Sequence, residues 1–310
     1  MTDRPRILVF AYHNVGYECL DVLLERGEDV IAVLTHEDST TEEIWFRSVG
    51  DLARRNGIPV YTPFTVNSPE WIHRIREWKA DLIFSFYYRN MISAEILRIP
   101  RLGAFNMHGS LLPKYRGRVP VNWAVLNGER ETGATLHHMV KRADAGDIVD
   151  QQAVPIGPDD TALEVFTKVT AAARALLERR IDEIKAGTPP RRPQDESQAT
   201  TFGGRKPEDG RIDWTRSARS IYDLVRAVTH PYPGAFTEVN GMRFTVWRAK
   251  VQTEFSGTPG QVISIAPLRI TAGTGALEII TYQWDDTQEQ HAASGLHGLR
   301  LGQALAGKTS

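Results

Sequence analysis

The most informative segment of the chain is Ala104-Phe105-Asn106-Met107-His108-Gly109-Ser110-Leu111-Leu112-Pro113, which follows the apolar run Asp81-Leu82-Ile83-Phe84-Ser85-Phe86-Tyr87-Tyr88. Alternate side chains of an extended strand point to the same face, so Asn106 and His108 would share one wall. An amide that donates to an oxyanion and an imidazole that moves a proton indicate chemistry on a carbonyl group. Because Gly109 and Pro113 turn the chain away, the pair would lie at a strand end, where open α/β sheets bind ligands.

Strand and helix signals alternate through the first 150 residues. Apolar runs predict strands over residues 6–12, 29–35, 58–61 and 81–88, and helical periodicity predicts helices over 17–25, 43–55 and 69–79. This alternation predicts an α/β fold with a doubly wound parallel sheet. The turn after the first strand, His13-Asn14-Val15-Gly16, lacks the G-x-G-x-x-G pattern, which argues against a dinucleotide-dependent dehydrogenase.

The remainder of the chain changes character. A long amphipathic helix is predicted over residues 161–185, where Thr161 and Glu164 form a capping box. A breaker-rich connector follows, and short strands then surround Asn240-Gly241, a strong type I′ hairpin signal. These strands predict a smaller, OB-like β-barrel. The pattern predicts a catalytic domain over residues 1–193, a linker loop over 194–210 and a β-barrel domain over 211–310.

The composition narrows the possible partners. The 310 residues carry a formal net charge of −1, which argues against a nucleic-acid partner. No apolar run approaches the roughly 20 residues of a membrane helix, so no membrane insertion is expected. The single cysteine, Cys19, excludes an internal disulfide and a cysteine-based zinc site, and predicts a cytoplasmic protein.

A second polar motif spans Val140-Lys141-Arg142-Ala143-Asp144-Ala145-Gly146, in a turn between two predicted strands. If Asp144 folds back against His108, its carboxylate would stabilise the charged imidazole and fix its orientation. Four other histidines show no ligand-like spacing to acids, and we expect them to be structural or surface groups: His13, His36, His137 and His138. No metal is expected.

Together, Asn106-x-His108, Ser110-Leu111-Leu112-Pro113 and the downstream Asp144 resemble the folate-dependent formyltransferases, which use 10-formyltetrahydrofolate. The resemblance is greatest to members that act on UDP-4-amino-4-deoxy-L-arabinose, and it covers nearly the whole chain. The motifs that carry this closer likeness are Phe10-Ala11-Tyr12-His13, Phe84-Ser85-Phe86-Tyr87-Tyr88-Arg89, Lys114-Tyr115-Arg116-Gly117-Arg118, and Pro231-x-Pro233-Gly234-Ala235-Phe236.

The resemblance implies a reaction and a set of site residues. The enzyme would formylate the 4-amino group of UDP-4-amino-4-deoxy-L-arabinose, in lipid A modification and resistance to polymyxin and other cationic antimicrobial peptides. Asn106 and His108 would stabilise the oxyanion, His108 would move the proton, and Asp144 would orient His108. The residues implied to contact the formyl donor are Asn90, Met91, Ile92, Arg118, Val140, Lys141, Arg142, Ala143 and Asp144.

Members of this subfamily also occur fused to a downstream dehydrogenase/decarboxylase. The sequence ends at Ser310 without that domain, so the expected partner is a separate or formerly fused enzyme. A homo-oligomer is compatible with the sequence.

Three alternatives stay open. The acceptor could be another nucleotide-linked amino sugar, such as a dTDP-linked 4-amino hexose. It could be methionyl-tRNA, although the acidic residues 35–43 would repel a phosphate backbone. The chain could also be a non-catalytic module that binds folate or a nucleotide sugar, against which the presence of Asn106, His108 and Asp144 argues.

Overall fold

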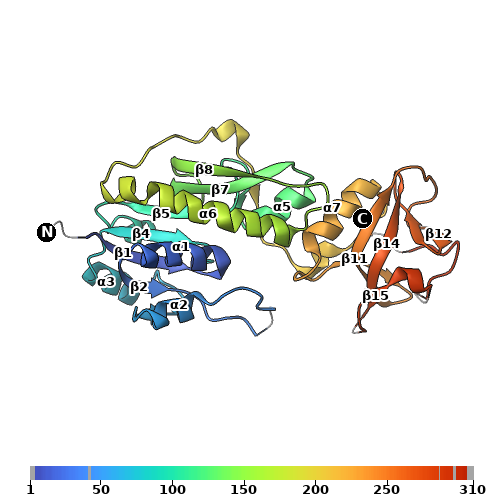
Figure 1. The fold of residues 1–310 in the computed structure, drawn as a ribbon, viewed down its shortest axis with the longest axis horizontal. Helices are drawn as coiled ribbons and strands as arrows, with labels where there is room; N and C mark the ends of the chain where they lie inside the picture. The colour runs from blue at the N-terminus through green and yellow to red at the C-terminus, as the bar shows by residue number, and fades with distance from the viewer. Residues whose placement is uncertain (1–3, 41–42, 286, 296–297, 306–310) are drawn as a thin grey trace. The chain divides into compact units, whose positions relative to one another are not determined.

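The computed structural model describes residues 4–40, 43–285, 287–295 and 298–305 (Figure 1). Contacts divide the chain into two compact units. The first comprises Met1–Pro120, Glu131–Pro155 and Phe166–Gly203, and the second comprises Val121–Arg130, Ile156–Val165 and Gly204–Ser310. The domain limits expected from the sequence, after residues 193 and 210, remain predictions.

A seven-stranded mixed sheet forms the core of the first unit, in the order β3-β2-β1-β4-β5-β7-β8. The five strands from β3 to β5 run parallel, which confirms the predicted α/β class, and β7 and β8 are antiparallel additions at one edge. The loop between β7 and β8 is too short for the crossover that parallel strands require. The strand bounds are β1 Arg6–Ala11, β2 Asp29–Leu34, β3 Val60–Tyr61, β4 Leu82–Phe86, β5 Ala104–His108, β7 Glu131–His138 and β8 Ile148–Pro155.

Burial explains why these strands read as continuous apolar runs. All five residues of β4 are buried, as are the last five of β1. A parallel strand covered by helices on both faces has no solvent side, so the apolar–polar alternation disappears. Each fully buried leucine, valine or phenylalanine contributes roughly 1.5–3 kcal/mol of transfer free energy.

Helices flank this sheet (Figure 1). Their bounds are α1 His13–Glu25, α2 Val49–Arg55, α3 Pro69–Glu77, α4 Ala94–Leu97 and α6 Ala162–Lys185. The predicted capping box of α6 is confirmed, since the Glu164 N–H donates to Thr161 Oγ1 at 3.3 Å and the Thr161 N–H donates to Glu164 Oε2 at 2.7 Å. Among the described residues, no helix has both the length and the apolar character needed to cross a membrane.

The start of α2 differs from the sequence prediction, which placed a helix over residues 43–55. The helix begins only at Val49, because Ser48 adopts an extended conformation and its Oγ accepts from the Asp51 N–H at 3.1 Å. Upstream, Phe46 stacks on the His13 ring with centroids 4.0 Å apart, and Trp45 meets the same ring edge-on at 4.6 Å. Aromatic packing beside the end of β1 thus replaces the predicted first turns.

The second unit confirms the predicted β-rich C-terminal domain as an antiparallel sheet, and it also holds α7 Ala218–Val228 and most of α5 Pro120–Leu126. The strand order is β10-β11-β14-β13-β12, and β15 pairs with β14. Asn240 and Gly241 both have positive φ, +52° and +81°, as the predicted type I′ hairpin requires. The bounds are β10 Ala235–Val239, β11 Met242–Gln252, β12 Val262–Ile265, β13 Leu268–Thr271, β14 Ala276–Trp284 and β15 Gln290–His291.

Residues 194–210, expected to be a loop, contain short regular elements. They hold the 3₁₀ turns Glu196–Gln198 and Pro207–Gly210 and strand β9 Thr201–Phe202. β9 pairs in parallel with β6 Arg116–Gly117, directly after the Ser-Leu-Leu-Pro motif. The first half of this segment therefore belongs to the unit that carries Asn106 and His108.

Candidate active site

The polar end of β5 brings three of the sequence-predicted residues together. Asn106 Nδ2 lies 3.4 Å from Asp144 Oδ1, and His108 Nδ1 lies 3.5 Å from the same oxygen. Asn106 and His108 are two positions apart on one strand, so they share a face, and Asp144 reaches them from the β7–β8 loop. The Asn106 amide and the His108 imidazole thus meet at a single carboxylate.

Backbone geometry aims Asp144 inward. Its φ of +53° lies in the left-handed region, and its Oδ2 accepts from the Gly117 N–H at 2.9 Å. Burial would raise the pKa of the Asp144 carboxyl, but the His108 charge and the Gly117 N–H hold that pKa well below its usual range. Asp144 is therefore a carboxylate, an acceptor on both oxygens.

His108 contacts an acceptor on each side of its ring. Nε2 lies 2.7 Å from the Tyr115 carbonyl oxygen, which can only accept, so Nε2 carries a proton. Nδ1 faces the Asp144 carboxylate, which also can only accept. Each ring nitrogen of His108 therefore has an acceptor beside it. The Tyr115 carbonyl is itself fixed, because the Tyr115 N–H donates to Thr200 Oγ1 at 2.8 Å.

His137 is a member of this cluster that the sequence reasoning assigned to structural or surface groups. The β5–β7 register pairs it directly with Asn106. Its Nε2 lies 3.0 Å from Asn106 Nδ2 and 3.6 Å from Asp144 Oδ1. The position of His137 opposite Asn106 comes from the antiparallel register of β5 and β7. A pattern within one strand does not show this register.

The segment after α6 supports the Asp144 loop. Gln194 Nε2 donates to the carbonyl oxygens of Asp144 and Gly146, both at 2.7 Å. Gln194 Oε1 accepts from Arg116 Nη2 at 2.7 Å, and Arg116 also pairs with Glu196 at 2.7 Å. Arg116 is only 1% exposed, so it stabilises this segment internally rather than facing a ligand.

The residues implied to contact the formyl donor lie in three segments: after β4, after β6, and between β7 and β8. Ile92 is buried in an apolar cluster with Ala104 of β5, and Met139, which precedes Val140, packs against the same cluster. Met91 and Val140 remain 57% and 46% exposed. Asn90 donates through Nδ2 to the Phe64 carbonyl at 3.3 Å. Lys141, Arg142 and Ala143 are exposed on the Asp144 loop, and Arg118 is exposed after β6.

Comparison with known families identifies the fold. Residues 6–181 match the model described as formyl transferase, and residues 205–300 match the formyl transferase C-terminal domain. The chain belongs to the formyl transferase family. It is therefore a group-transferring enzyme, as its sequence motifs predicted.

Solved structures share the fold of this formyltransferase at low identity. An N-formyltransferase from Helicobacter canadensis, in complex with folinic acid and dTDP-3-aminofucose, is 22% identical with a TM-score of 0.70, covering 89% of this chain and 99% of that one. WlaRD, a sugar 3N-formyltransferase solved with dTDP and 5-N-formyl-THF, is 21% identical with a TM-score of 0.69, covering 92% and 100%. HypX from Aquifex aeolicus with tetrahydrofolic acid is 21% identical with a TM-score of 0.63, covering 96% and 49%.

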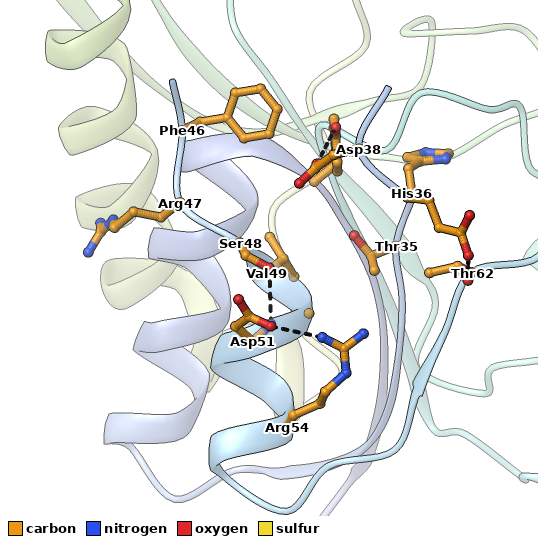
Figure 2. A pocket seen from close by; sticks show the side chains of 13 residues that line it. Thr35, His36, Asp38, Phe46, Arg47, Ser48, Val49, Asp51, Arg54 and Thr62 are labelled. Atoms are coloured by element: carbon orange, nitrogen blue, oxygen red, sulfur yellow. Dashed lines mark hydrogen bonds and ion pairs between the residues drawn. The ribbon is translucent and has the colours of Figure 1, made fainter. Parts of the chain in front are cut away.

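A separate cavity of about 280 Å³ is lined by residues that follow β1 and β2 and by the start of α2 (Figure 2). Its charged groups are internally paired: the Tyr12 hydroxyl donates to Asp38 at 2.8 Å, and Arg54 pairs with Asp51 at 2.9 Å. His36 Nε2 accepts from the Arg89 N–H at 3.0 Å, and burial together with the Arg89 charge lowers the pKa of His36 to about 4. Asn106, His108 and Asp144 do not line this cavity.

Across the residues that the structure describes, no group of three or more histidine, cysteine, aspartate or glutamate side chains is arranged to hold a metal ion.

Proposed function

We propose that this enzyme transfers the formyl group of 10-formyltetrahydrofolate to the amino group of a nucleotide-linked sugar, with UDP-4-amino-4-deoxy-L-arabinose as the acceptor. The observation that carries this proposal is the meeting of Asn106 and His108 on the Asp144 carboxylate, in a chain of the formyl transferase family. The structural neighbours bind folinic acid or 5-N-formyl-THF together with dTDP or a dTDP-linked amino sugar, which supports both substrate classes.

The donor-binding loops have the chemistry that a folate requires. Exposed Met91 and Val140 offer apolar surface to a flat pterin ring. Phe64 is 98% exposed, and its carbonyl accepts from Asn90, the neighbour of Met91. Arg118 lies after β6 and offers a guanidinium to a carboxylate. When bound, 10-formyltetrahydrofolate would supply the formyl carbon that the amine attacks.

Asn106 and His108 would act on the charge that forms at the formyl oxygen. Asn106 Nδ2 has two hydrogens, and the one directed to Asp144 at 3.4 Å makes only a long contact, so it is available to the developing oxyanion. One preorganised donor of this kind is worth about 2.7–4 kcal/mol of barrier reduction. His108 would deliver its proton to the leaving folate nitrogen and then take up the proton released by the attacking amine.

Asp144 would keep His108 in this role. A carboxylate 3.5 Å from Nδ1 favours the charged ring and fixes its plane, while the Tyr115 carbonyl holds the opposite nitrogen. The longer Nδ1 contact is the one more easily exchanged for substrate. Catalytic hydrogen bonds commonly shorten once substrate is bound.

Charge favours a small acceptor over tRNA. Glu37 and Asp38, after β2, are exposed, and they would repel an extended phosphate backbone. Thr41 and Glu42 of the same acidic segment lie outside the described residues. Lipid A modification is the setting that follows if the acceptor is the arabinose nucleotide.

The test is release of tetrahydrofolate from 10-formyltetrahydrofolate with three acceptors offered separately. These are UDP-4-amino-4-deoxy-L-arabinose, a dTDP-linked 4-amino hexose and methionyl-tRNA. We expect turnover with the UDP sugar alone. Turnover confined to the dTDP sugar would correct the acceptor, turnover with tRNA would overturn the charge argument, and folate binding without transfer to any acceptor would support a non-catalytic module.

A further inference from the structure

We infer that His137 is a positioning residue of the formyltransferase site: its ring, which accepts at Nε2, holds the Asn106 amide in the orientation that the oxyanion needs. The inference rests on the proposed function, because it assigns His137 a purpose through Asn106. His137 does not reach the sugar or the folate in this assignment. It acts on the one amide that would donate to the reacting oxygen.

The tautomer of His137 follows from its partners. Nδ1 lies 2.9 Å from the His138 carbonyl oxygen, which can only accept, so Nδ1 carries a proton. Nε2 lies 3.0 Å from Asn106 Nδ2, which can only donate. A ring with its proton on Nδ1 satisfies both contacts, since Nε2 then offers a lone pair to the amide. The Asp144 carboxylate lies farther from Nε2, at 3.6 Å.

The orientation of the Asn106 amide is fixed by the same logic. A reversed amide would place its oxygen 3.4 Å from Asp144 Oδ1, and two acceptors would then face each other. It would also leave the lone pair of His137 Nε2 without a donor. The Asp144 carboxylate and the His137 ring therefore both favour the same orientation of the Asn106 amide, with Nδ2 directed toward them.

Holding one hydrogen of this amide determines where the other points. The hydrogen bonded to His137 at 3.0 Å is committed, and the planar amide then directs the second toward the shared space near Asp144 and His108. Without His137 the side chain can rotate about its bonds, and the donor is no longer preorganised. Preorganisation of such donors is what accelerates reactions of this type.

Burial separates this role from a direct catalytic one. The His137 side chain is 2% exposed and lies on β7 opposite Asn106, within one strand pair. Its ring is enclosed by the His138 carbonyl, Asn106 and Asp144. A group so enclosed is suited to orienting a neighbour.

Two substitutions of His137 divide its contacts between them. The substitution His137→Gln introduces a side-chain oxygen that can occupy the position of Nε2 and accept from Asn106. His137→Asn keeps a polar group at the position of Nδ1, which can bond the His138 carbonyl but cannot reach Asn106. We expect kcat to fall about tenfold in His137→Asn and to stay within about threefold of wild type in His137→Gln, with the KM for the formyl donor unchanged in both.

A double-mutant cycle with Asn106→Ala tests whether the effect passes through Asn106. In the Asn106→Ala background, we expect His137→Asn to change the residual kcat by less than about twofold. His138→Asn is the matched control, because His138 is also buried but its Nε2 contacts the Pro190 carbonyl at 3.2 Å instead of the site. Thermal melting of each variant confirms that it is folded.

The outcomes distinguish this inference from the proposed function. If Asn106→Ala loses activity while His137→Asn retains that of wild type, His137 has no positioning role and the inference fails alone. If His137→Gln loses as much activity as His137→Asn, or if the loss in His137→Asn persists in the Asn106→Ala background, the role does not pass through Asn106. If Asn106→Ala retains full turnover, the proposed mechanism itself fails.

A measurement on the resting enzyme needs no acceptor. Long-range ¹⁵N–¹H NMR of the histidine rings reports which nitrogen carries the proton. We expect Nδ1 of His137 to carry the proton and Nε2 to be the acceptor. A ring protonated on Nε2 would place a hydrogen against the Asn106 amide and would overturn the inference.

Discussion

Replacing Asp144 by asparagine tests the centre of the proposed site. The amide oxygen of Asp144→Asn can still accept from the Gly117 N–H, which lies 2.9 Å from Oδ2. The amide nitrogen then takes the place of Oδ1, and it faces His108 Nδ1 as one donor facing another, at a wild-type separation of 3.5 Å. The substitution therefore keeps the shape and the backbone contact while removing the charge that holds the imidazole.

The magnitude follows from the distance. Two unit charges 3.5 Å apart attract by about 4.7 kcal/mol at an effective dielectric constant of about 20. If half of that interaction stabilises the transition state more than the ground state, kcat falls about 50-fold, and if all of it does, kcat falls about 3,000-fold. We therefore expect a loss between these limits.

The assay is the initial rate of tetrahydrofolate release at saturating 10-formyltetrahydrofolate and nucleotide amino sugar. Asp147→Asn is the control, because this carboxylate lies on the same loop but pairs with the exposed Arg191 at 3.3 Å. We expect Asp147→Asn to stay near wild type. A folded Asp144→Asn enzyme with kcat within threefold of wild type would refute the assignment of Asp144 to His108.

Three further outcomes are expected. Gln194→Met removes the donor to the Asp144 and Gly146 carbonyls, both 2.7 Å away. Urea unfolding should show a free energy of unfolding lower by about 2 kcal/mol, and kcat should also fall. Unchanged values would show that residue 194 does not support the Asp144 loop. Gly117→Ala would place a Cβ 2.2 Å from the carbonyl oxygen of Phe202 in β9, at a φ of +99°. Its free energy of unfolding in urea should fall by more than the ~1 kcal/mol expected for Gly57→Ala, where φ is +72° but the space is open. Equal losses in the two variants would contradict the clash. Because the pKa of Asp144 is depressed on folding, its stabilisation is complete above the ordinary carboxyl pKa of about 4 and is lost as pH falls further. The difference in melting temperature between wild type and Asp144→Asn should therefore be constant well above about pH 4 and shrink as the pH falls below about 4; a difference that grows as the pH falls would contradict the charge assignment.

Local patterns predicted the elements that local physics controls. The capping residues of α6 and the two-residue hairpin at Asn240 were readable, because caps and tight turns depend on residues a few positions apart. The predicted start of α2 at residue 43 was wrong, because Ser48 caps the helix and Phe46 stacks on the His13 ring. That contact joins two segments more than 30 residues apart, so the pattern of residues within 43–55 does not predict it.

The site divides along the same line. Alternation along one strand placed Asn106 and His108 on a common wall, and the motif resemblance selected Asp144 as the third member. The sequence pattern did not reveal His137, because its place opposite Asn106 comes from the antiparallel register of β5 and β7. Gln194 was likewise expected to lie in a linker, yet it bonds the Asp144 loop 50 residues away.

The α/β class, the β-rich C-terminal region and the residue types at the end of β5 follow from the order of residues alone, since period, turn chemistry and strand alternation are local properties. The strand beside β5, the return of the loop after β7 to Gly117, and the groups around the Asp144 carboxylate follow only from the folded chain. Strand register and loop closure depend on contacts between segments distant in sequence, and those contacts exist only once the whole sheet has formed.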